Sequence, residues 1–307
     1  MLLAIPALRV LARASPRGTL ALAAQARISR LLETLGVVNR AVDFESLGLD
    51  ALFEAEAGGR PRQWPARCAE VLRHATRVVA WIGSREPLFV ERLTALAPGS
   101  IVAASVGSGR PVWEHLVATL GATGALGAAE AGGDHALRAP VGVPATLVDE
   151  ARRELVGHGW NERDRLLLVH PGAGGTGKRW TSAGFAAVLE RVAALPAVAV
   201  VLHQGPSDSA AIAALPKHVT AHAIRLREPP LPLLAGTLTL VAAYLGNDSG
   251  ISHLAAATGT PAVVLFGAER LIWRPWALHV EPQVVSLAAE EESDIERVAS
   301  AVTALLR

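Results

Sequence analysis

The sequence lacks the features that mark secreted proteins and proteins that span a membrane. Cysteine occurs once, as Cys68, so no disulfide can form within the chain and nothing points to an oxidising compartment. No apolar run approaches the roughly 20 residues that a membrane-spanning helix requires. The apolar opening from Met1 to Leu8 lacks the basic start of a signal peptide and is interrupted by Arg9. We therefore expect a cytoplasmic protein with at most peripheral contact with the inner face of the cytoplasmic membrane.

Lysine and asparagine are also scarce. Of the 29 Lys and Arg residues only Lys178 and Lys217 are lysine, and asparagine occurs only at positions 39, 161 and 247. The formal net charge of +1 gives no overall attraction to nucleic acid, so we expect no such partner, and we expect a monomer. In a chain this poor in Lys and Asn, either residue within a glycine-rich loop is more informative than it would be elsewhere.

Short apolar runs alternate with longer helical patterns, which is typical of an α/β fold with parallel strands. At 307 residues the chain is long enough for two domains, which we place at residues 1–143 and 144–307. We expect both to be Rossmann-like and to face a central cleft. Strands of the second domain are predicted at residues 166–170, 197–203, 219–225, 241–246, 262–266 and 283–286.

The loop from His170 to Trp180 follows the first of these strands and precedes a helix. Its glycines allow backbone N–H groups to approach an anion closely, and the helix N-terminus adds its dipole. Lys178 places a positive charge beside these amides. The pattern favours a phosphate-binding loop over a tight turn with an incidental lysine. The loop residues expected to bind the ligand are Gly172, Ala173, Gly174, Gly175 and Lys178.

The same loop matches the G-x-x-x-x-G-K pattern of P-loop nucleotidases between Gly172 and Lys178. The next residue is Arg179, however, at the position where coordination of Mg²⁺ requires Ser or Thr. The loop also contains a second glycine pair and ends in Trp180, which a P-loop does not need. The sequence therefore argues against that class.

A second strand-to-helix loop runs from Gly246 to His253. Asp, Ser and Gly are common at helix N-termini, so capping alone could explain part of it. In the strand order 3-2-1-4-5, however, the loops after strands one and four flank the position where ligands of such sheets bind. The two loops should therefore form one diphosphate site that includes His253. Asp248 would repel phosphate, so its place beside the diphosphate suits sugar or ribose hydroxyls, or a cation bound there, and indicates a nucleotide sugar.

Both loops resemble glycosyltransferase family 9, the lipopolysaccharide heptosyltransferases. The likeness rests on residues 170–180, 245–257, 259–267 and 273–275, and it extends to the opening helix at residues 2–8. It implies a GT-B fold and a transfer with inversion of a heptose-like sugar. The donor would be ADP-linked, the acceptor a saccharide or lipopolysaccharide, and no metal or other cofactor would be obligatory.

The resemblance also implies roles for individual residues. Lys178 would meet the donor phosphates or sugar, Asp248 the sugar, and both would act in catalysis. The diphosphate would be bound by Ser249, Gly250 and His253. The family also has an acidic residue that Asp208 does not clearly match.

Two further expectations follow from the resemblance. In the family, a short strand and a Gly-Asp pair precede the helix that resembles Leu2–Arg9, and that aspartate is the proposed base. This chain starts at or just after that place, so we expect the strand and the general base to lie upstream of Met1, leaving a gap in the first sheet. The likeness also implies that the last helix, Asp294–Leu306, packs back onto the N-terminal domain through an apolar face.

Two other functions remain open at this point. One is a nucleotide-sugar epimerase on the same architecture, which would need no separate acceptor. The other is a nucleotide-sugar-binding protein without efficient catalysis, because a donor site could persist where the acceptor hydroxyl has no base.

Overall fold

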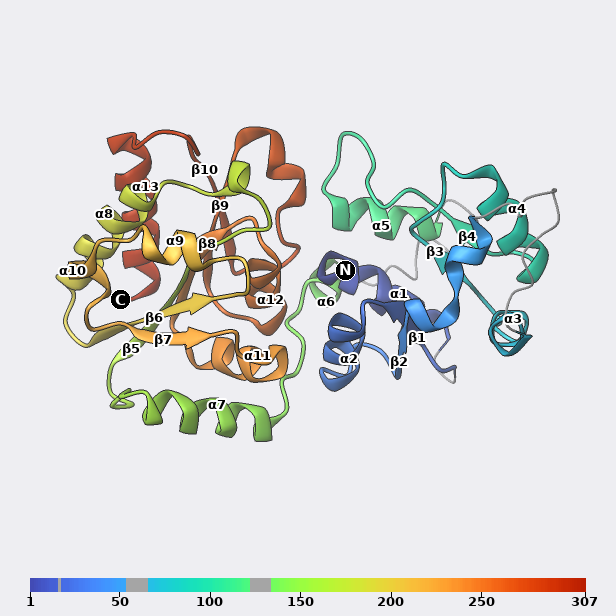
Figure 1. Ribbon diagram of the computed structural model, residues 1–307, viewed down its shortest axis with the longest axis horizontal. Helices are drawn as coiled ribbons and strands as arrows, with labels where there is room; N and C mark the ends of the chain where they lie inside the picture. Colours follow the sequence, from blue (N-terminus) through green and yellow to red (C-terminus); the bar gives the residue numbers. More distant parts are fainter. Residues whose placement is uncertain (16–17, 54–65, 122–133) are drawn as a thin grey trace. The chain divides into compact units, whose positions relative to one another are not determined.

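The structure is a computed structural model that describes residues 1–15, 18–53, 66–121 and 134–307 and divides into two compact units. Unit 1 contains Met1 and Leu3–Leu137, and unit 2 contains Leu2 and Arg138–Arg307. The division falls a few residues before the expected domain boundary at 143/144. Both units alternate strands and helices (Figure 1).

The strands of unit 1 are short and form two separate parallel pairs, β1 with β2 and β3 with β4. The strands are β1 (Ala21–Ala24), β2 (Arg40–Asp43), β3 (Val79–Ala80) and β4 (Ile101–Val102). The helices are α1 (Ile5–Ala14), α2 (Ala26–Thr34), α3 (Ala66–Arg73), α4 (Pro87–Leu96), α5 (Val112–Gly121) and α6 (Asp134–Leu137). The 3-10 turns are η1 (Leu2–Ala4), η2 (Glu45–Leu47) and η3 (Leu49–Leu52).

The two strand pairs share one apolar core, although among the described residues of unit 1 they form no common sheet. Buried side chains of η3 and α4 make up this core, among them Leu52, Phe89 and Leu93. Val42 of β2 and Val102 of β4 both pack against it. The core of unit 1 therefore joins elements whose strands pair only two by two in the described residues.

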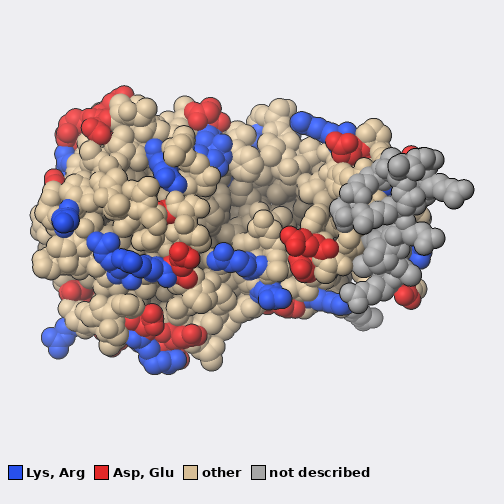
Figure 2. Space-filling model, in the orientation of Figure 1, with Lys and Arg blue, Asp and Glu red and all other residues tan. Residues whose placement is uncertain are grey.

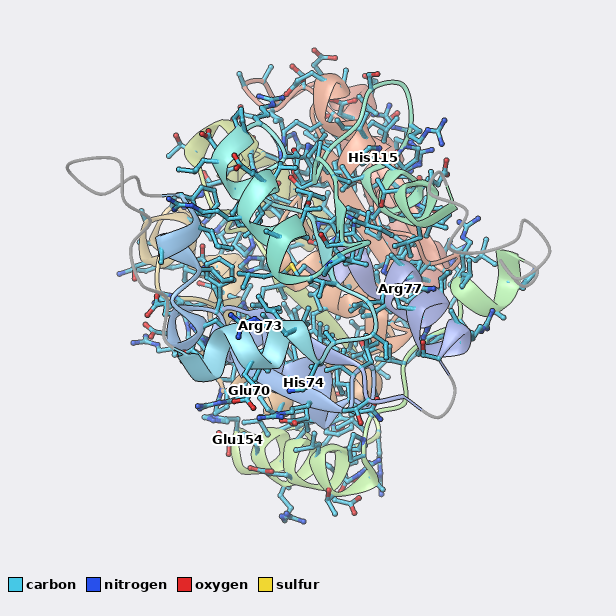
Figure 3. The ribbon with its side chains drawn as sticks, turned by 90° about the vertical axis from the view of Figure 1, so that its right-hand side faces the viewer. Glu70, Arg73, His74, Arg77, His115 and Glu154 are labelled. Atoms are coloured by element: carbon cyan, nitrogen blue, oxygen red, sulfur yellow. The ribbon has the colours of Figure 1, made fainter. Side chains whose placement is uncertain are left out.

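One side-chain contact anchors α5 in unit 1. Nε2 of His115 lies 2.9 Å from the carbonyl oxygen of Ala104, just after β4 (Figure 3). The ring lies so close to Gly107 that a Cβ there would be 2.2 Å from its Nδ1. A glycine is therefore required at this position by the close approach of the ring.

Unit 2 is a Rossmann-like unit with one six-stranded parallel sheet in the order β10-β9-β8-β5-β6-β7. The strands are β5 (Arg165–His170), β6 (Val198–Gln204), β7 (Ile224–Arg227), β8 (Ala243–Asn247), β9 (Ala262–Phe266) and β10 (Val280–Val284). The helices are α7 (Ala145–Gly157), α8 (Ser182–Ala193), α9 (Ser209–Ala213), α10 (Lys217–Thr220), α11 (Leu231–Leu240), α12 (Gly250–Thr258) and α13 (Glu292–Leu305), with 3-10 turns η4 (Thr176–Lys178) and η5 (Ala268–Trp273). Counted along the chain this order is 3-2-1-4-5-6, which agrees with the sequence-based expectation for the first five strands.

Helices cover both faces of this sheet, with α7 and α11 on one face and α8 and α13 on the other (Figure 1). Leu167 and Val169 of β5 pack into the core beneath α8 and α13. Leu166 and Leu168 are equally buried, and the alternation of side chains along a strand directs them to the opposite face. The near-continuous apolar strands seen in the sequence are therefore explained by a parallel sheet buried on both faces.

The last helix corrects one expectation. The apolar face of α13, including Ile295, Val298 and Val302, is buried in the core of unit 2 against α8 and the sheet. The expectation that this face packs onto the N-terminal domain is therefore wrong. Burying it over β8 and β9 completes the apolar layer on that side of the sheet, which α8 alone does not cover.

Charge is distributed without a dominant sign on the face of the molecule in view, where basic and acidic side chains are interspersed (Figure 2). In the described part of the chain, no helix is both long enough and apolar enough to cross a membrane.

Candidate functional site

The two loops selected from the sequence meet in unit 2. Strands β5 and β8 are neighbours, and their paired ends place His170 beside Gly246. The glycine loop, residues 171–180, follows β5, and the segment 247–253 follows β8. The chain leaves β5 toward β6 on one side of the sheet and later returns to β8 on the other. The loops therefore flank the switch point of the sheet, where ligands of such folds bind.

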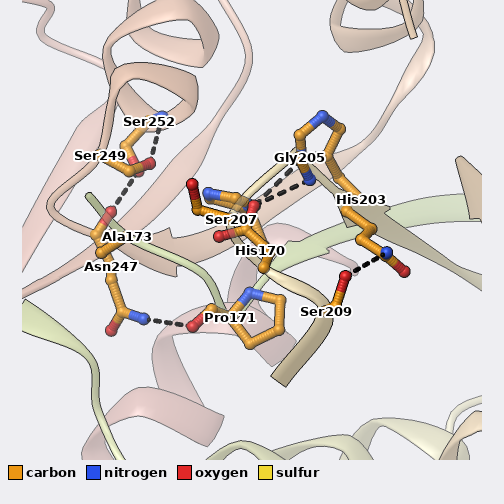
Figure 4. A network of polar contacts seen from close by, with 12 residues as sticks. His170, Pro171, Ala173, His203, Gly205, Ser207, Ser209, Asn247, Ser249 and Ser252 are labelled. Atoms are coloured by element: carbon orange, nitrogen blue, oxygen red, sulfur yellow. Dashed lines mark hydrogen bonds and ion pairs between the residues drawn. The ribbon is translucent and has the colours of Figure 1, made fainter. Parts of the chain in front are cut away.

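Asn247 ties the two loops together. Its side-chain amide donates to the carbonyl oxygen of Pro171 (2.9 Å), and its side-chain oxygen accepts from the backbone N–H of Trp180 (3.0 Å). The side chain is completely buried, and the bond to Pro171 is visible in Figure 4. Asn247 thus holds both ends of the glycine loop to the end of β8. The rare asparagine noted in the sequence therefore positions the glycine loop through hydrogen bonds from both ends of its side-chain amide.

The glycine loop is buried at its start and open at its tip. A Cβ on Gly172 would lie 2.0 Å from Oδ1 of Asp208, so this glycine is required by close packing. Gly174, Gly175 and Gly177 have nothing within 4 Å of such a Cβ, which leaves room beside the backbone for a ligand. Ala173, by contrast, is buried.

The end of the glycine loop differs from the simple strand–loop–helix expected. The loop first forms the 3-10 turn η4, and α8 begins only at Ser182. Thr181 caps α8 by accepting a hydrogen bond from the N–H of Gly184 (3.0 Å). The helix N-terminus is therefore partly satisfied by its own cap and offers less to an anion than the sequence suggested. Arg179 donates to the carbonyl oxygen of Ala173 (3.0 Å), so it braces the loop instead of coordinating a metal.

Asp248 is the centre of a cluster of positive charge. Its Oδ2 accepts a hydrogen bond from Nε of Arg270 (2.7 Å) and lies 3.8 Å from Nζ of Lys178. Its Oδ1 lies 3.7 Å from Nε2 of His253. Lys178, Arg270 and Asp248 carry +1, +1 and −1, so the cluster has a net charge of +1 before any proton is added to His253.

The carboxylate of Asp248 stays ionised although the side chain is buried. Burial raises the pKa of this group, but its interactions with His253 and Arg270 outweigh that effect and hold the pKa below its ordinary value. The expectation for Asp248 named sugar or ribose hydroxyls or a bound cation, and the cations beside it in the structure are side chains of this chain. They neutralise the charge that would otherwise repel a diphosphate.

The N-terminus of α12 completes the candidate site around Asp248. Ser249 caps this helix, because its Oγ accepts a hydrogen bond from the N–H of Ser252 (3.3 Å). The hydroxyl of Ser252 in turn lies 2.9 Å from that of Tyr244. Gly250 is exposed and opens the helix, and His253 lies in its first turn. Nδ1 of His253 is buried without a hydrogen-bond partner among the described residues.

A second polar group lies beneath the glycine loop. Nδ1 of His170 is 3.0 Å from Nδ1 of His203 and 3.8 Å from Oδ2 of Asp208 (Figure 4). Burial lowers the pKa of His170 to about 4. Burial and the neighbouring His170 lower the pKa of His203 to about 3. Both rings are therefore neutral at physiological pH.

Sequence reasoning missed Arg270 and His203 at this end of the sheet. Nothing local marks Arg270, because it reaches Asp248 from the separate turn η5. His203 could have been found, since it follows the residue of β6 that pairs with Val169, the neighbour of His170. A histidine at or next to the end of each of two adjacent parallel strands places the two rings at one edge of the sheet.

Comparison with known proteins assigns unit 2 to a family. The family model described as glycosyltransferase family 9 (heptosyltransferase) matches residues 137–302, nearly the whole of this unit. A lipopolysaccharide heptosyltransferase 3 from Escherichia coli is 34% identical over 136 residues, which is 41% of this chain and 38% of that protein. The same-named protein from Escherichia coli strain K12 is 33% identical over 137 residues, 42% of this chain and 38% of its own length. The chain thus matches well under half the length of these curated relatives.

Solved structures extend the likeness over both units. An ADP-heptose lipopolysaccharide heptosyltransferase II from E. coli superposes with a TM-score of 0.71 at 20% identity, covering 100% of this chain and 95% of that one. A family 9 glycosyltransferase from Veillonella parvula gives 0.70 at 16% identity, covering 99% and 93%. At these identities the likeness shows the fold. The GT-B fold class expected from the sequence is therefore confirmed.

Proposed function

Because this chain belongs to glycosyltransferase family 9 (heptosyltransferase), we propose that it transfers a sugar from a nucleoside-diphosphate donor to a saccharide acceptor. The donor in this proposal is an ADP-linked, heptose-like sugar, the acceptor is of the lipopolysaccharide type, and transfer proceeds with inversion. The observation that carries the proposal is the cluster of Lys178, Arg270 and His253 around Asp248, at the switch point of the sheet.

The proposed roles of these residues follow from where negative charge develops during transfer of the sugar. Breaking the bond between sugar and diphosphate leaves a nucleoside diphosphate, whose developing charge must be stabilised. Lys178 reaches this charge from the glycine loop, and the exposed N-terminus of α12 at Gly250 adds backbone N–H groups and the helix dipole. These fixed groups need no reorganisation as the bond breaks. An obligatory metal is therefore not part of the proposal.

Asp248 has a positioning role in this proposal as well as a binding role. It holds the side chain of Arg270 by a hydrogen bond and attracts those of Lys178 and His253. A carboxylate offers about four acceptor positions, so it keeps capacity for a sugar hydroxyl. In this proposal Asp248 contacts both the cationic side chains and a hydroxyl of the donor sugar.

The first experiment measures binding of the donor half. Purified chain is titrated calorimetrically with ADP, UDP and GDP, and the Lys178→Ala variant is titrated in parallel. We expect micromolar to millimolar binding with ADP preferred, and a clear loss in the variant. Absence of binding of all three diphosphates, or equal affinity in the variant, would refute the donor site.

The second experiment measures transfer. The chain is incubated with ADP-heptose and a deacylated lipopolysaccharide acceptor, and the product is analysed by mass spectrometry and by the anomeric coupling in its NMR spectrum. A product with inverted configuration supports the whole proposal. Donor binding without product would leave a nucleotide-sugar-binding protein, and release of an isomerised nucleotide sugar would establish an epimerase instead.

A further inference from the structure

The triad of His170, His203 and Asp208 lies outside the proposed donor chemistry. His170 is the last residue of β5, His203 lies near the end of β6, and Asp208 precedes α9. All three residues are at most 6% exposed, and one ligand atom from each lies within 4.8 Å of the other two. The triad is thus a buried, preformed group of two imidazoles and a carboxylate.

The hydrogen bonds within the chain do not fully account for the arrangement of these three buried side chains. The two Nδ1 atoms face each other at 3.0 Å, so only one of the two rings can donate there. Oδ2 of Asp208 accepts a hydrogen bond from the N–H of Gly205 (2.8 Å), but its 3.8 Å separation from Nδ1 of His170 is too long for a hydrogen bond. Gly205 is therefore the hydrogen-bond donor to Oδ2 of this buried carboxylate, and Nδ1 of His170 lies beyond hydrogen-bonding distance from it.

These separations match a metal site. With metal–ligand bonds of about 2.0–2.2 Å and tetrahedral angles, ligand atoms lie about 3.4 Å apart. The observed 3.0 Å and 3.8 Å lie on either side of that value. Two imidazoles with one carboxylate are a ligand set that suits zinc and its neighbours among the first-row metals.

We propose that His170, His203 and Asp208 bind one divalent transition-metal ion, with Zn²⁺ as the favoured ion. The ion would join the ends of β5 and β6 to the start of α9. Because Oδ1 of Asp208 packs against Gly172, the bound ion would also fix the base of the glycine loop. The site is structural in this proposal and does not depend on the proposed transferase activity.

Several histidine–carboxylate pairs on the surface of the described residues differ from the triad in burial. Glu70 on α3 and His74 just after that helix (Figure 3) are 67% and 79% exposed, and Glu154 and His158 are about half exposed. Each of these pairs offers one imidazole and one carboxylate to solvent. They are expected to bind metal weakly and without fixed geometry.

The test uses the whole chain without an affinity tag, freed of metal by dialysis against EDTA. Co²⁺ is added as a spectroscopic probe, because a four-coordinate Co²⁺ site absorbs strongly in the visible range and an exposed six-coordinate one does not. We expect one equivalent of Co²⁺ to produce this spectrum, one equivalent of Zn²⁺ to abolish it, and the melting temperature to rise with Zn²⁺.

Two variants test the assignment. Asp208→Asn keeps an acceptor for Gly205 but removes the charge, and His203→Gln removes one imidazole; each should weaken Zn²⁺ binding by more than about tenfold. His222→Gln, at an exposed position outside the triad, should bind as the wild type does. Failure of the wild type to give the four-coordinate Co²⁺ spectrum would overturn the proposal by itself. Unchanged binding in both triad variants would overturn it equally.

Discussion

Nε of Arg270 lies 2.7 Å from Oδ2 of Asp248, so the buried carboxylate beside the glycine loop is paired with a cation from a third loop. Asp248 follows β8, whereas Arg270 lies in η5 after β9. The pair therefore links the ends of two neighbouring strands at the candidate donor site. It is also the shortest of the three cation contacts to a carboxylate that burial would otherwise tend to protonate.

Replacing Arg270 by Gln should destabilise unit 2. The substitution removes a charged hydrogen bond to a buried carboxylate, and such bonds contribute about 1.5–3 kcal/mol. We expect the free energy of unfolding at pH 7, measured by urea denaturation, to fall by about that amount. Arg225→Gln, an exposed arginine on β7, is the matched control and should change stability by less than about 0.5 kcal/mol. Equal effects of the two variants would contradict the importance of the pair.

The pH dependence of stability should report the same pair. The pKa of Asp248 is lower in the folded state than the unfolded value of about 3.9. Its contribution to the free energy of unfolding is therefore fully present above that unfolded value, and it is lost as the pH falls through the folded pKa. The difference in unfolding free energy between wild type and Arg270→Gln should therefore be constant from pH 7 to about pH 5. Below about pH 4 it should decrease. A difference that grows on acidification would show that another group is responsible.

Lys178→Ala should weaken binding of ADP. Loss of a charged hydrogen bond to phosphate corresponds to about 1.5–3 kcal/mol, or roughly 10- to 150-fold in Kd. Isothermal titration calorimetry gives this quantity directly. The other lysine of the chain supplies the control, since Lys217 is exposed on α10 and its substitution by Ala should leave Kd unchanged.

Asp248→Asn should separate recognition of sugar from recognition of diphosphate. Removing the carboxylate raises the net charge of the cluster by one, so free ADP should bind at least as tightly as before. Affinity for the nucleotide sugar, or turnover, should fall, because an acceptor for sugar hydroxyls becomes an amide. Parallel titrations with ADP and ADP-heptose measure both. If both affinities fell in proportion to a loss of stability, Asp248 would have only a structural role.

Asn247→Ala should loosen the glycine loop. The change removes both side-chain bonds and leaves the carbonyl of Pro171 and the N–H of Trp180 without these partners, at a cost of about 2–4 kcal/mol in stability. Hydrogen exchange at residues 172–180 should accelerate while that of β6 and β7 stays slow. The exposed Asn161→Ala is the control and should leave exchange in the loop unchanged.

Much of unit 2 could be predicted because its signals are local. Apolar strands, glycine loops and the amphipathic last helix are each readable within a few residues, and the parallel order of strands then places loops 171–180 and 247–253 together. The selection of Lys178, Asp248 and His253 followed from that order. The partner of the last helix was predicted wrongly, since an apolar face shows that a helix is buried but not against what.

The sequence by itself determined the α/β class, the resemblance to family 9, and the pairing of two loops at one switch point, because these depend on periodicity and on residues adjacent in the chain. Only the tertiary structure decided which polar and charged side chains contact one another. Arg270 meets Asp248 from another strand end, His203 meets His170 across two strands, and Asn247 uses both ends of its amide on one loop. Contacts of this kind depend on side-chain positions set by packing over the whole sheet, which no local pattern of residues encodes.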